Sequence, residues 1–403
     1  MTEPVSPPSF QDTLLFVPTM RQLIVALTLA SLFTGGLKVT AGVDLRLSYI
    51  FVGISFFSFI FIFQNPKIII FPILVILSYM ILCFLIVLIQ DSSILLTRTI
   101  PQIIGISFFA FFFILFFSNA QIAPSDLFLA YVRLAAVVAL LGFPILLYSG
   151  VTEGFWRLKS IFAEPAHYSI AMMPATSYAI IKAKSNLGRF LLFFTAIVLT
   201  FSLTAYIGLG LTLAFAVGRN WYTRIAMAFF ATLLLIGAYA SSSEIRMRID
   251  DTSRVASTTD FSNVNLSTYA LLSNLWVAWK SLQENPIFGS GLGSHPINHE
   301  RYIGQLKGLG SLEEYIDQNK FDANSLFIRI VSEQGFFGFC LFIIFIISFH
   351  KSWNQEYQII NNSILIYFIL KLIREGHYFT PEFFFMIFIY IFNSSRYRRY
   401  AAT

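Results

Sequence analysis

The chain has 403 residues, of which 57% are hydrophobic and only 12% are charged. Soluble domains carry about 25% charged residues, so this composition excludes an ordinary soluble protein. The net charge of +6 does not indicate a nucleic-acid partner, because most Lys and Arg residues stand at the ends of apolar runs, where they orient membrane helices. Runs such as residues 68–90 lack the alternation of barrel strands. We therefore expect an all-α, polytopic membrane protein.

Apolar runs of about 20 residues, the length that crosses ~30 Å of hydrocarbon, recur along the chain. We predict twelve membrane segments, at residues 18–36, 46–63, 68–90, 101–118, 127–149, 166–182, 189–203, 205–218, 225–240, 326–349, 360–374 and 381–393. The pair 189–203 and 205–218 is short. One long helix with a break near Thr204 is the alternative, and it would invert the topology of the following segments.

The distribution of positive charge orients the segments. With twelve crossings, most Lys and Arg residues of the short loops fall on the cytoplasmic side, as membrane insertion favours. Both termini are then cytoplasmic, and the polar stretch 241–325 is external. The chain divides into residues 1–240 with nine helices, the loop 241–325, and residues 326–403 with three helices and a basic tail.

Within the loop, residues 267–282 predict an amphipathic helix that lies on the membrane surface. Its apolar positions recur every three to four residues, at Leu271, Leu272, Leu275, Trp276 and Trp279. Asn285 and Pro286 end this helix. Three alternating glycines follow, at positions 289, 291 and 293, and they indicate tight turns or backbone that another group approaches closely.

Four functional groups gather before and within the start of the predicted segment 166–182: Arg157, Glu164, His167 and Tyr168. Glu164 precedes a proline, so it could simply cap a helix, where a carboxylate is favourable. The alternative is a carboxylate that orients an arginine or accepts the proton of a sugar hydroxyl. The close grouping at a membrane surface favours the second interpretation.

Other candidates are spread along the chain. Arg133 lies inside a predicted membrane segment, where an arginine faces either an anion or a structural partner. The polar turn 374–378 contains Arg374, His377 and Tyr378 and faces the same side as the loop, which carries Arg254 and Arg301 among its arginines. We expect Arg157, Arg254 and Arg374 to converge on one anion.

Two patterns would allow a metal site. His295 and His299 have a suitable spacing on a regular helix, and Asp250 with Asp251 could bind a divalent ion. A proline between the histidines argues against the first, and the neighbouring Arg254 argues against the second. We predict no metal and no other cofactor.

These motifs resemble the O-antigen ligase and O-antigen polymerase superfamily of glycan-assembly membrane proteins. Residues 285–293, NPIFGSGLG, are similar to the stretch before the family's large loop turns back. The ligases end that loop with His, then Asn, Ser or Gln, nine free positions, Gly, two free positions and a small residue or Tyr. Asn324, Ser325, Gly335 and Gly338 stand in this register. Residues 162–169 and 374–378 resemble the polymerase side, and the resemblance covers residues 125–393.

The resemblance implies a GT-C-like fold with one large periplasmic loop in a bacterial inner membrane. It also implies a metal-independent polymerase that passes a growing glycan from one polyprenyl-diphosphate-linked oligosaccharide to a hydroxyl of another. Membrane lipids and a chain-length regulator would be further partners. A ligase with a different lipid acceptor and a non-enzymatic flippase or transporter are the alternatives.

Asn324 stands where the resemblance implies that ligases carry a basic histidine. An amide has no usable pKa near 7, so Asn324 is expected to hold a hydroxyl, beside Ser325, without taking its proton. The base would then be Glu164, which we favour, or His167 or His377.

Overall fold

The structure, a computed structural model, describes residues 20–40, 44–62, 66, 69–90, 92–217, 221–258, 261, 263–306 and 310–397. Its helices are α1 (Met20–Ser31), α2 (Leu47–Ile62), α3 (Ile70–Gln90), α4 (Ile100–Asn119), α5 (Pro124–Glu153), α6 (Pro165–Ile181), α7 (Leu187–Val198), α8 (Leu203–Leu211), α9 (Trp221–Ser241), α10 (Ser243–Thr258), α11 (Leu266–Glu284), α12 (His295–Tyr302), α13 (Leu326–His350), α14 (Gln355–Ile373) and α15 (Pro381–Phe392). Antiparallel strands β1 (Lys38–Thr40) and β2 (Asp44–Arg46) stand between α1 and α2.

Each predicted membrane segment contains a helix, from α1 to α9 and from α13 to α15, so the all-α expectation is confirmed. Four stretches of the described residues are long and apolar enough to cross a membrane: Pro72–Gln90, Leu95–Asn119, Pro124–Glu153 and Leu326–His350. The chain is therefore a multi-pass membrane protein. Twelve crossings and an external loop remain predictions.

The doubtful stretch 189–218 forms two helices, α7 and α8, with a break between them. Phe201 in the break has a φ of 44°, a left-handed conformation that a bulky residue rarely adopts. The Arg157 guanidinium donates hydrogen bonds to the carbonyl oxygens of Thr200, at 3.2 Å, and Phe201, at 3.1 Å. A cation thus satisfies carbonyl groups that the end of a helix leaves without intrahelical partners.

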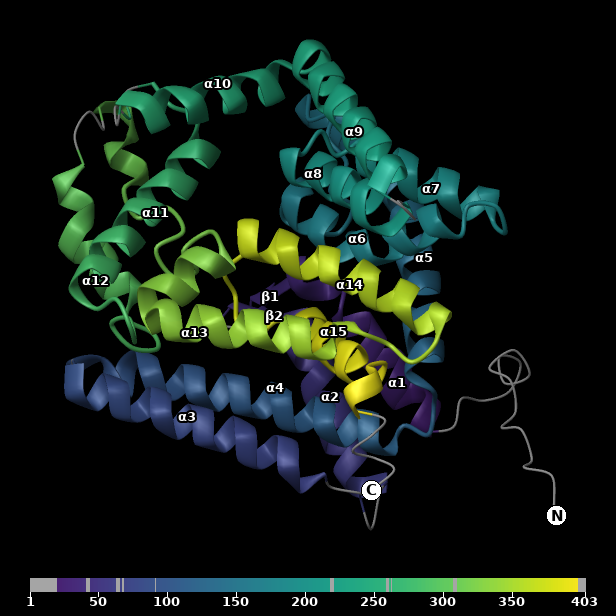
Figure 1. The fold of residues 1–403 in the computed structure, drawn as a ribbon, viewed down its shortest axis with the longest axis horizontal. Coiled ribbons are helices and arrows are strands. Elements are labelled where there is room, and N and C mark those ends of the chain that lie inside the picture. Colours follow the sequence, from purple (N-terminus) through teal and green to yellow (C-terminus); the bar gives the residue numbers. More distant parts are fainter. Residues whose placement is uncertain are drawn as a thin grey trace.

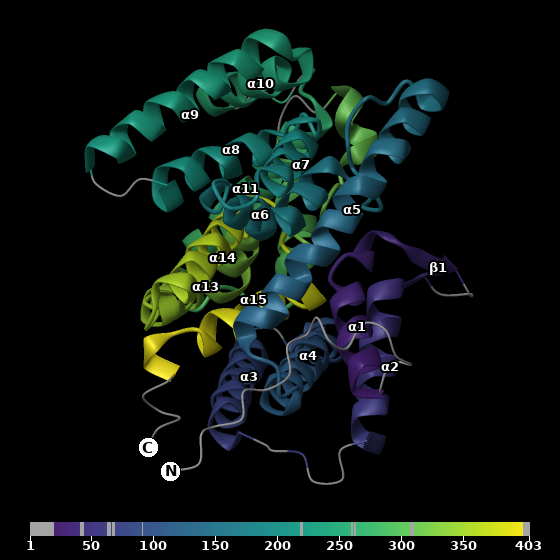
Figure 2. The same ribbon diagram turned by 90° about the vertical axis from the view of Figure 1, so that its right-hand side faces the viewer.

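The helices pack around α13 and α14. The paired helices α3 and α4 lie along α13, and α14 runs beside α13 on its other side (Figure 1). Helix α6 packs against α14, α7 and α8, while the long α5 passes α1 and α2 (Figure 2). Phenylalanines of α4 meet those of α15, where the Phe113 ring centroid lies 6.4 Å from that of Phe384 and 6.3 Å from that of Phe388.

The glycine-rich stretch and α13 form one feature. Gly335 interrupts α13 with φ 60° and ψ −158°, and the interrupted backbone pairs with residues 286–291. Gly291 N–H donates to the Glu333 carbonyl at 2.8 Å, and Phe337 N–H donates to the Ile287 carbonyl at 2.9 Å. A Cβ on Gly335 would lie only 2.5 Å from the Gly289 nitrogen. Two glycine clusters that are distant in sequence therefore permit one close backbone crossing.

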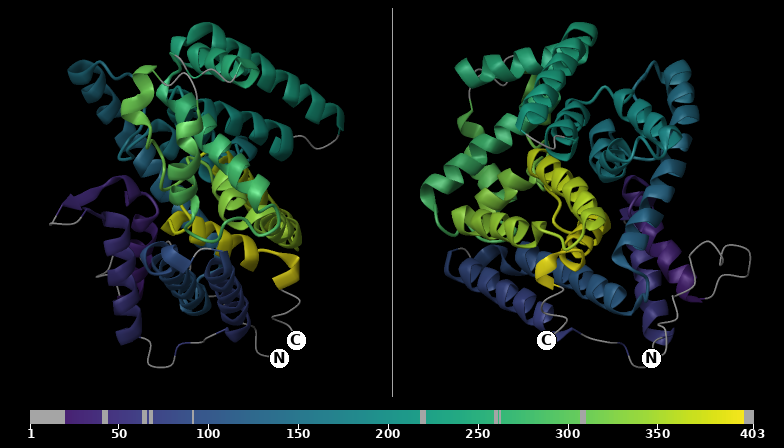
Figure 3. Two further views of the ribbon diagram at one scale, coloured as in Figure 1. Left: turned by 90° about the vertical axis from the view of Figure 1, so that its left-hand side faces the viewer. Right: turned by 45° about the vertical axis from the view of Figure 1, so that its right-hand side comes forward.

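The loop contains α10, α11 and α12, which Figure 3 shows from two further sides. Helices α11 and α12 pack against α13, whereas α10 packs against α9 and α11. Helix α11 confirms the predicted helix but turns its small and polar side toward the protein, with Asn274 and Ser281 fully buried. The apolar side chains of Leu275 and Trp279 are exposed. Contact of this exposed side with the membrane remains a prediction.

Candidate active site

A cavity of about 390 Å³ lies where the α5–α6 loop, the start of α8, α10, the start of α11 and the end of α14 meet. Figure 1 shows the arrangement of α8, α10, α11 and α14, which contribute residues to its wall. The charged side chains of its wall are Arg157, Lys159, Glu164, Arg248 and Arg374. The rest of the wall combines hydroxyl, amide and apolar side chains, including Thr252, Leu266, Ser267, Thr268, Leu271, Gln318, Asn319 and Ile373. This mixture suits a ligand with an anionic group, polar groups and an apolar part.

Glu164 and Arg374 meet in this wall although 210 positions separate them in sequence. Arg374 Nη2 lies 3.4 Å from Glu164 Oε2. Glu164 directly precedes α6, but its side chain makes no capping hydrogen bond. This contact places Glu164 where it can orient Arg374, and the carboxylate also stands at the favourable N-terminus of α6. Its role in the reaction stays a prediction.

Arg248 completes the cationic part of the cavity. Burial, together with the positive charges of Arg157 and Arg374, lowers the pKa of Arg248 to about 10. Arg248 remains protonated at pH 7, so three guanidinium groups oppose one another's charge in one place. Bidentate, charge-assisted hydrogen bonds to a phosphate would relieve this repulsion.

Arg248 was not singled out from the sequence, whereas Arg254 was. These residues are six positions apart on α10 and point in directions that differ by about 120°. Arg254 does not line the cavity; its guanidinium donates to Asp251 Oδ1 and to the Asn263 carbonyl, both at 3.2 Å. The helical periodicity of α10 was the signal that could have separated the two arginines.

Arg133 and Arg301 also lie outside the cavity wall. Arg133 is on the exposed side of α5. The Arg301 guanidinium, on α12, lies 3.5 Å from the Glu284 carboxylate, and both side chains are about half exposed. The predicted substrate-binding roles of these two arginines find no support from their positions.

The polar turn 374–378 docks against the residues that precede α13. Glu375 N–H donates to the Asn324 carbonyl at 2.8 Å, and Arg329 Nη1 donates to the Gly376 carbonyl at 3.0 Å. The His377 imidazole then lies beside Asp322, with Nε2 3.4 Å from Asp322 Oδ2. The predicted catalytic residues His377 and Asn324 are therefore brought to one place.

Asn324 and Ser325 are buried. Asn324 has a φ of 59°, and its side-chain amide nitrogen has no hydrogen-bond partner among the described residues. Ser325 caps α13, since its Oγ accepts from Ile328 N–H at 3.3 Å and donates to the Leu372 carbonyl at 2.6 Å. Ser325 thus joins α13 to α14, and neither residue lines the 390 Å³ cavity.

His167 lies half-buried on α6, near the same turn. Burial tends to raise the pKa of the Glu375 carboxyl, but Lys371, His167 and His377 outweigh it and lower this pKa. The Lys371 ammonium lies 3.2 Å from Glu375. His167 therefore contributes to the electrostatics of the turn from outside the cavity wall.

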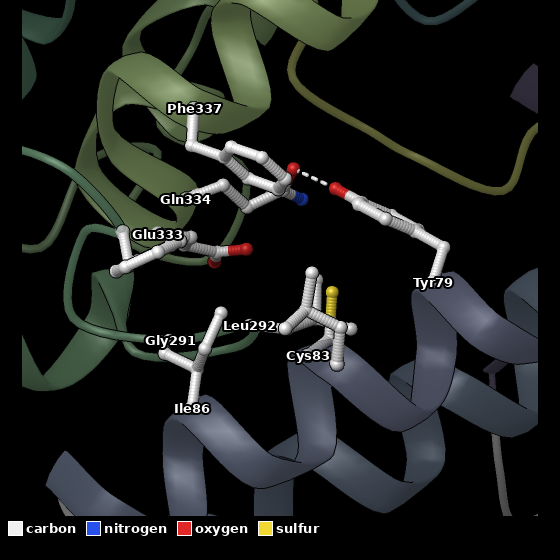
Figure 4. A pocket seen from close by; sticks show the side chains of 10 residues that line it. Tyr79, Cys83, Ile86, Gly291, Leu292, Glu333, Gln334 and Phe337 are labelled. Atoms are coloured by element: carbon white, nitrogen blue, oxygen red, sulfur yellow. Dashed lines mark hydrogen bonds between the residues drawn. The ribbon is translucent and has the colours of Figure 1, made fainter.

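A second cluster of polar side chains lies inside the helix bundle, between α3 and α13 (Figure 4). Arg329 Nε lies 3.2 Å from Glu333 Oε1, and both side chains are buried. Tyr79 donates a hydrogen bond to Gln334, whose Nε2 lies 3.4 Å from the hydroxyl of the predicted site residue Tyr378. Charged residues four apart in the apolar run 326–349 were a sequence signal for this pair, because ionisable groups in such runs are expensive.

The structure uses the candidate metal ligands in other ways. His295 Nδ1 lies 3.0 Å from Ser332 Oγ and Nε2 lies 2.9 Å from Asn274 Oδ1, so both ring nitrogens have partners. Burial lowers the pKa of His295 to about 3. Asp251 accepts hydrogen bonds from the backbone and the side chain of Asn265. These residues stabilise the loop.

Comparison with known proteins found one family. The family model described as O-Antigen ligase (Wzy_C) matches residues 188–343, from α7 to the middle of α13. The match includes Arg248, the glycine-rich stretch and the Asn324–Ser325 register. A search of the curated proteins found no match. The family match confirms the resemblance to the O-antigen ligase and polymerase superfamily over residues 188–343.

Proposed function

We propose that the protein is a polymerase that joins polyprenyl-diphosphate-linked oligosaccharide repeats on the periplasmic face of a bacterial inner membrane. The superfamily acts on lipid-linked oligosaccharides in glycan assembly, and the proposal specifies a second lipid-linked repeat as the acceptor. The loop 241–325 would be periplasmic and both termini cytoplasmic. Residues 1–19 and 398–403 lie outside the described residues.

The reaction is a glycosyl transfer. An acceptor hydroxyl oxygen attacks the anomeric carbon of the donor chain, and a new C–O bond forms. The bond from the anomeric carbon to the phosphate oxygen breaks, and its electron pair leaves with the polyprenyl diphosphate. The hydroxyl proton passes to a protein base. Negative charge develops on the diphosphate in this transition state, and its stabilisation is the main requirement for catalysis.

The cationic wall of the cavity is the observation that carries the proposal. Arg157, Arg248 and Arg374 stand together with Lys159, and their charges disfavour one another while no anion is bound. Such a group can stabilise a departing diphosphate without a metal ion. Apolar wall residues such as Leu203 and Ile373 would contact the first part of the polyprenyl chain.

The glycans of a deletion strain test the proposal against its alternatives. A strain without the polymerase should make products with single repeats, still attached to their final lipid. Loss of all glycan from that lipid would instead indicate a ligase. Accumulation of precursor on the cytoplasmic face would indicate a flippase. Asn324, in place of a basic histidine, favours the first outcome.

Glu164→Gln is expected to lower turnover about 100-fold, with little change in lipid binding, because the amide retains the shape of the side chain but loses the charge that orients Arg374. Turnover is measured with purified protein and a lipid-linked repeat. Glu153→Gln, at the exposed end of α5, is the matched control. Normal turnover of Glu164→Gln would show that Glu164 has no role in the reaction and acts only at the start of α6.

A further inference from the structure

Asp322 is held so that its two carboxylate oxygens face different partners. Oδ1 accepts hydrogen bonds from Asn324 N–H at 3.1 Å and from Asn319 Nδ2 at 3.0 Å. Oδ2 lies 3.4 Å from His377 Nε2. The same carboxylate therefore closes the turn before α13 and faces an imidazole from the α14–α15 connection.

The backbone on both sides of this pair is fixed in unusual conformations. Ala323, Asn324 and Glu375 have φ values of 56°, 59° and 85°, and such residues are costly unless their surroundings hold them. The bonds from Glu375 N–H to the Asn324 carbonyl and from Arg329 to the Gly376 carbonyl provide that restraint. Strain of this kind is concentrated at functional sites.

The His377 imidazole has two neighbours that favour different protonation states of Nε2. Asp322 requires a proton on Nε2, whereas Arg46 Nη2, 3.3 Å from the same nitrogen, requires a lone pair there. Only the bond to Asp322 leaves the lone pair on Nδ1, where it can accept a proton. The tautomer therefore decides whether His377 can act as a base.

Burial is the main reason why His377 is neutral at pH 7. Burial lowers the pKa of His377 to about 4; Arg46 and Arg329 act in the same direction, while Asp322 and Glu375 oppose them. A neutral imidazole is the form that takes up a proton.

We propose that Asp322 is the positioning residue of His377, and that His377 Nδ1 accepts the proton of the acceptor hydroxyl. The proposal rests on the proposed glycosyl transfer and supplies its base. As the hydroxyl oxygen bonds to the anomeric carbon, its proton moves to Nδ1. The bonding pair of the anomeric carbon leaves with the diphosphate, and the imidazolium later releases its proton to water.

The pair lies at the edge of the cationic cavity. Asn319 lines the cavity and also donates to Asp322, and Arg374, three residues before His377, lines it as well. The proposal requires that a diphosphate bound at the arginines directs its anomeric carbon toward Asn319 and this pair. Glu164 keeps its role beside Arg374.

Asp322→Asn is the first test. The amide oxygen can still accept from Asn324 N–H, but the amide nitrogen then donates to His377 Nε2 and moves the ring proton to Nδ1. In the serine protease triad the corresponding change costs about 10⁴ in kcat. We expect kcat to fall about 100-fold or more with KM nearly unchanged. Asp317→Asn, an exposed carboxylate paired with Lys320, should behave like the wild-type protein.

A double-substitution cycle separates positioning from general stability. If Asp322 acts through His377, the double variant Asp322→Asn with His377→Ala should be no slower than His377→Ala alone. Multiplicative losses would overturn the proposal, as would full turnover of Asp322→Asn.

The pH profile gives a third readout. Wild-type turnover should fall only below about pH 5, and residual activity of Asp322→Asn should extend to lower pH because the carboxylate raises the pKa of His377.

The variants are compared in whichever glycan transfer the wild-type protein performs. Transfer to a lipid other than a second repeat would reject the polymerase and leave the test of Asp322 intact, because the same hydroxyl proton must be removed. If the wild-type protein forms polymer and the Asp322→Asn variant forms it equally well, only the positioning role of Asp322 is rejected.

Discussion

Turnover of Arg248→Ala is expected to fall about 100- to 1,000-fold, the effect of removing one preorganised group that stabilises developing negative charge. Its thermal stability in detergent should stay at, or rise above, that of the wild-type protein. Burial and the charges of Arg157 and Arg374 lower the pKa of Arg248, so the charged form is disfavoured in the empty site. The Arg248 charge opposes folding but serves the reaction, so its removal should lower activity without lowering stability.

Arg254→Ala is the matched control, since it removes an arginine from the same helix without changing the cavity wall. Arg248→Lys should restore little activity, because an ammonium offers a point charge in place of a planar pair of donors. Polymer length and turnover are measured alongside the melting temperature of each purified variant. Full turnover of Arg248→Ala, or equal losses in Arg254→Ala, would show that the arginines only anchor the loop at the membrane surface.

Gly376→Ala is expected to abolish polymer formation and to lower the amount of folded protein. A Cβ on Gly376 would overlap the Asp322 carbonyl oxygen and lie 3.0 Å from the Ser325 carbonyl oxygen. Both are main-chain atoms of the turn before α13, so no side-chain rotation can make room. The turn 374–378 must move away, which displaces Arg374 from the cavity and His377 from Asp322.

Gly304→Ala provides the comparison, because a Cβ at this position meets no atom of the described residues within 4 Å. Protein yield, melting temperature and polymer length are measured for both variants. We expect Gly304→Ala to match the wild-type protein in all three. A Gly376→Ala variant with normal yield and normal polymer would show that the turn tolerates displacement and that the two halves of the site are independent.

The helices were predictable because each is encoded locally. Runs such as residues 101–118 and 326–349 are long and apolar, and the structure places α4 and α13 there. The two glycine clusters were found in the sequence as separate motifs. Their contact was not predictable, since the crossing of Gly289 and Gly335 depends on how the loop returns to α13.

The types of residue in the site were predictable from the sequence, but only some of the individual residues were. Glu164, Arg157 and Arg374 were chosen from their positions near membrane surfaces, and the cavity contains all three. Arg248 and Asp322 were missed, because their roles depend on which side of α10 faces inward and on a turn with left-handed residues. Contacts across 55 or more positions, such as Asp322 with His377, are set by tertiary packing and leave no local pattern.

The turn 374–378 also has a consequence for biosynthesis. Synthesis proceeds from the N-terminus, so the cationic wall from Arg157 to Arg248 is made long before Arg374 and His377 emerge. The Asp322 turn must wait for the α14–α15 connection to reach its side of the membrane, because Glu375 and Gly376 provide its hydrogen bonds. The proposed glycosyl transfer should therefore begin only after the last helix pair of the chain is inserted.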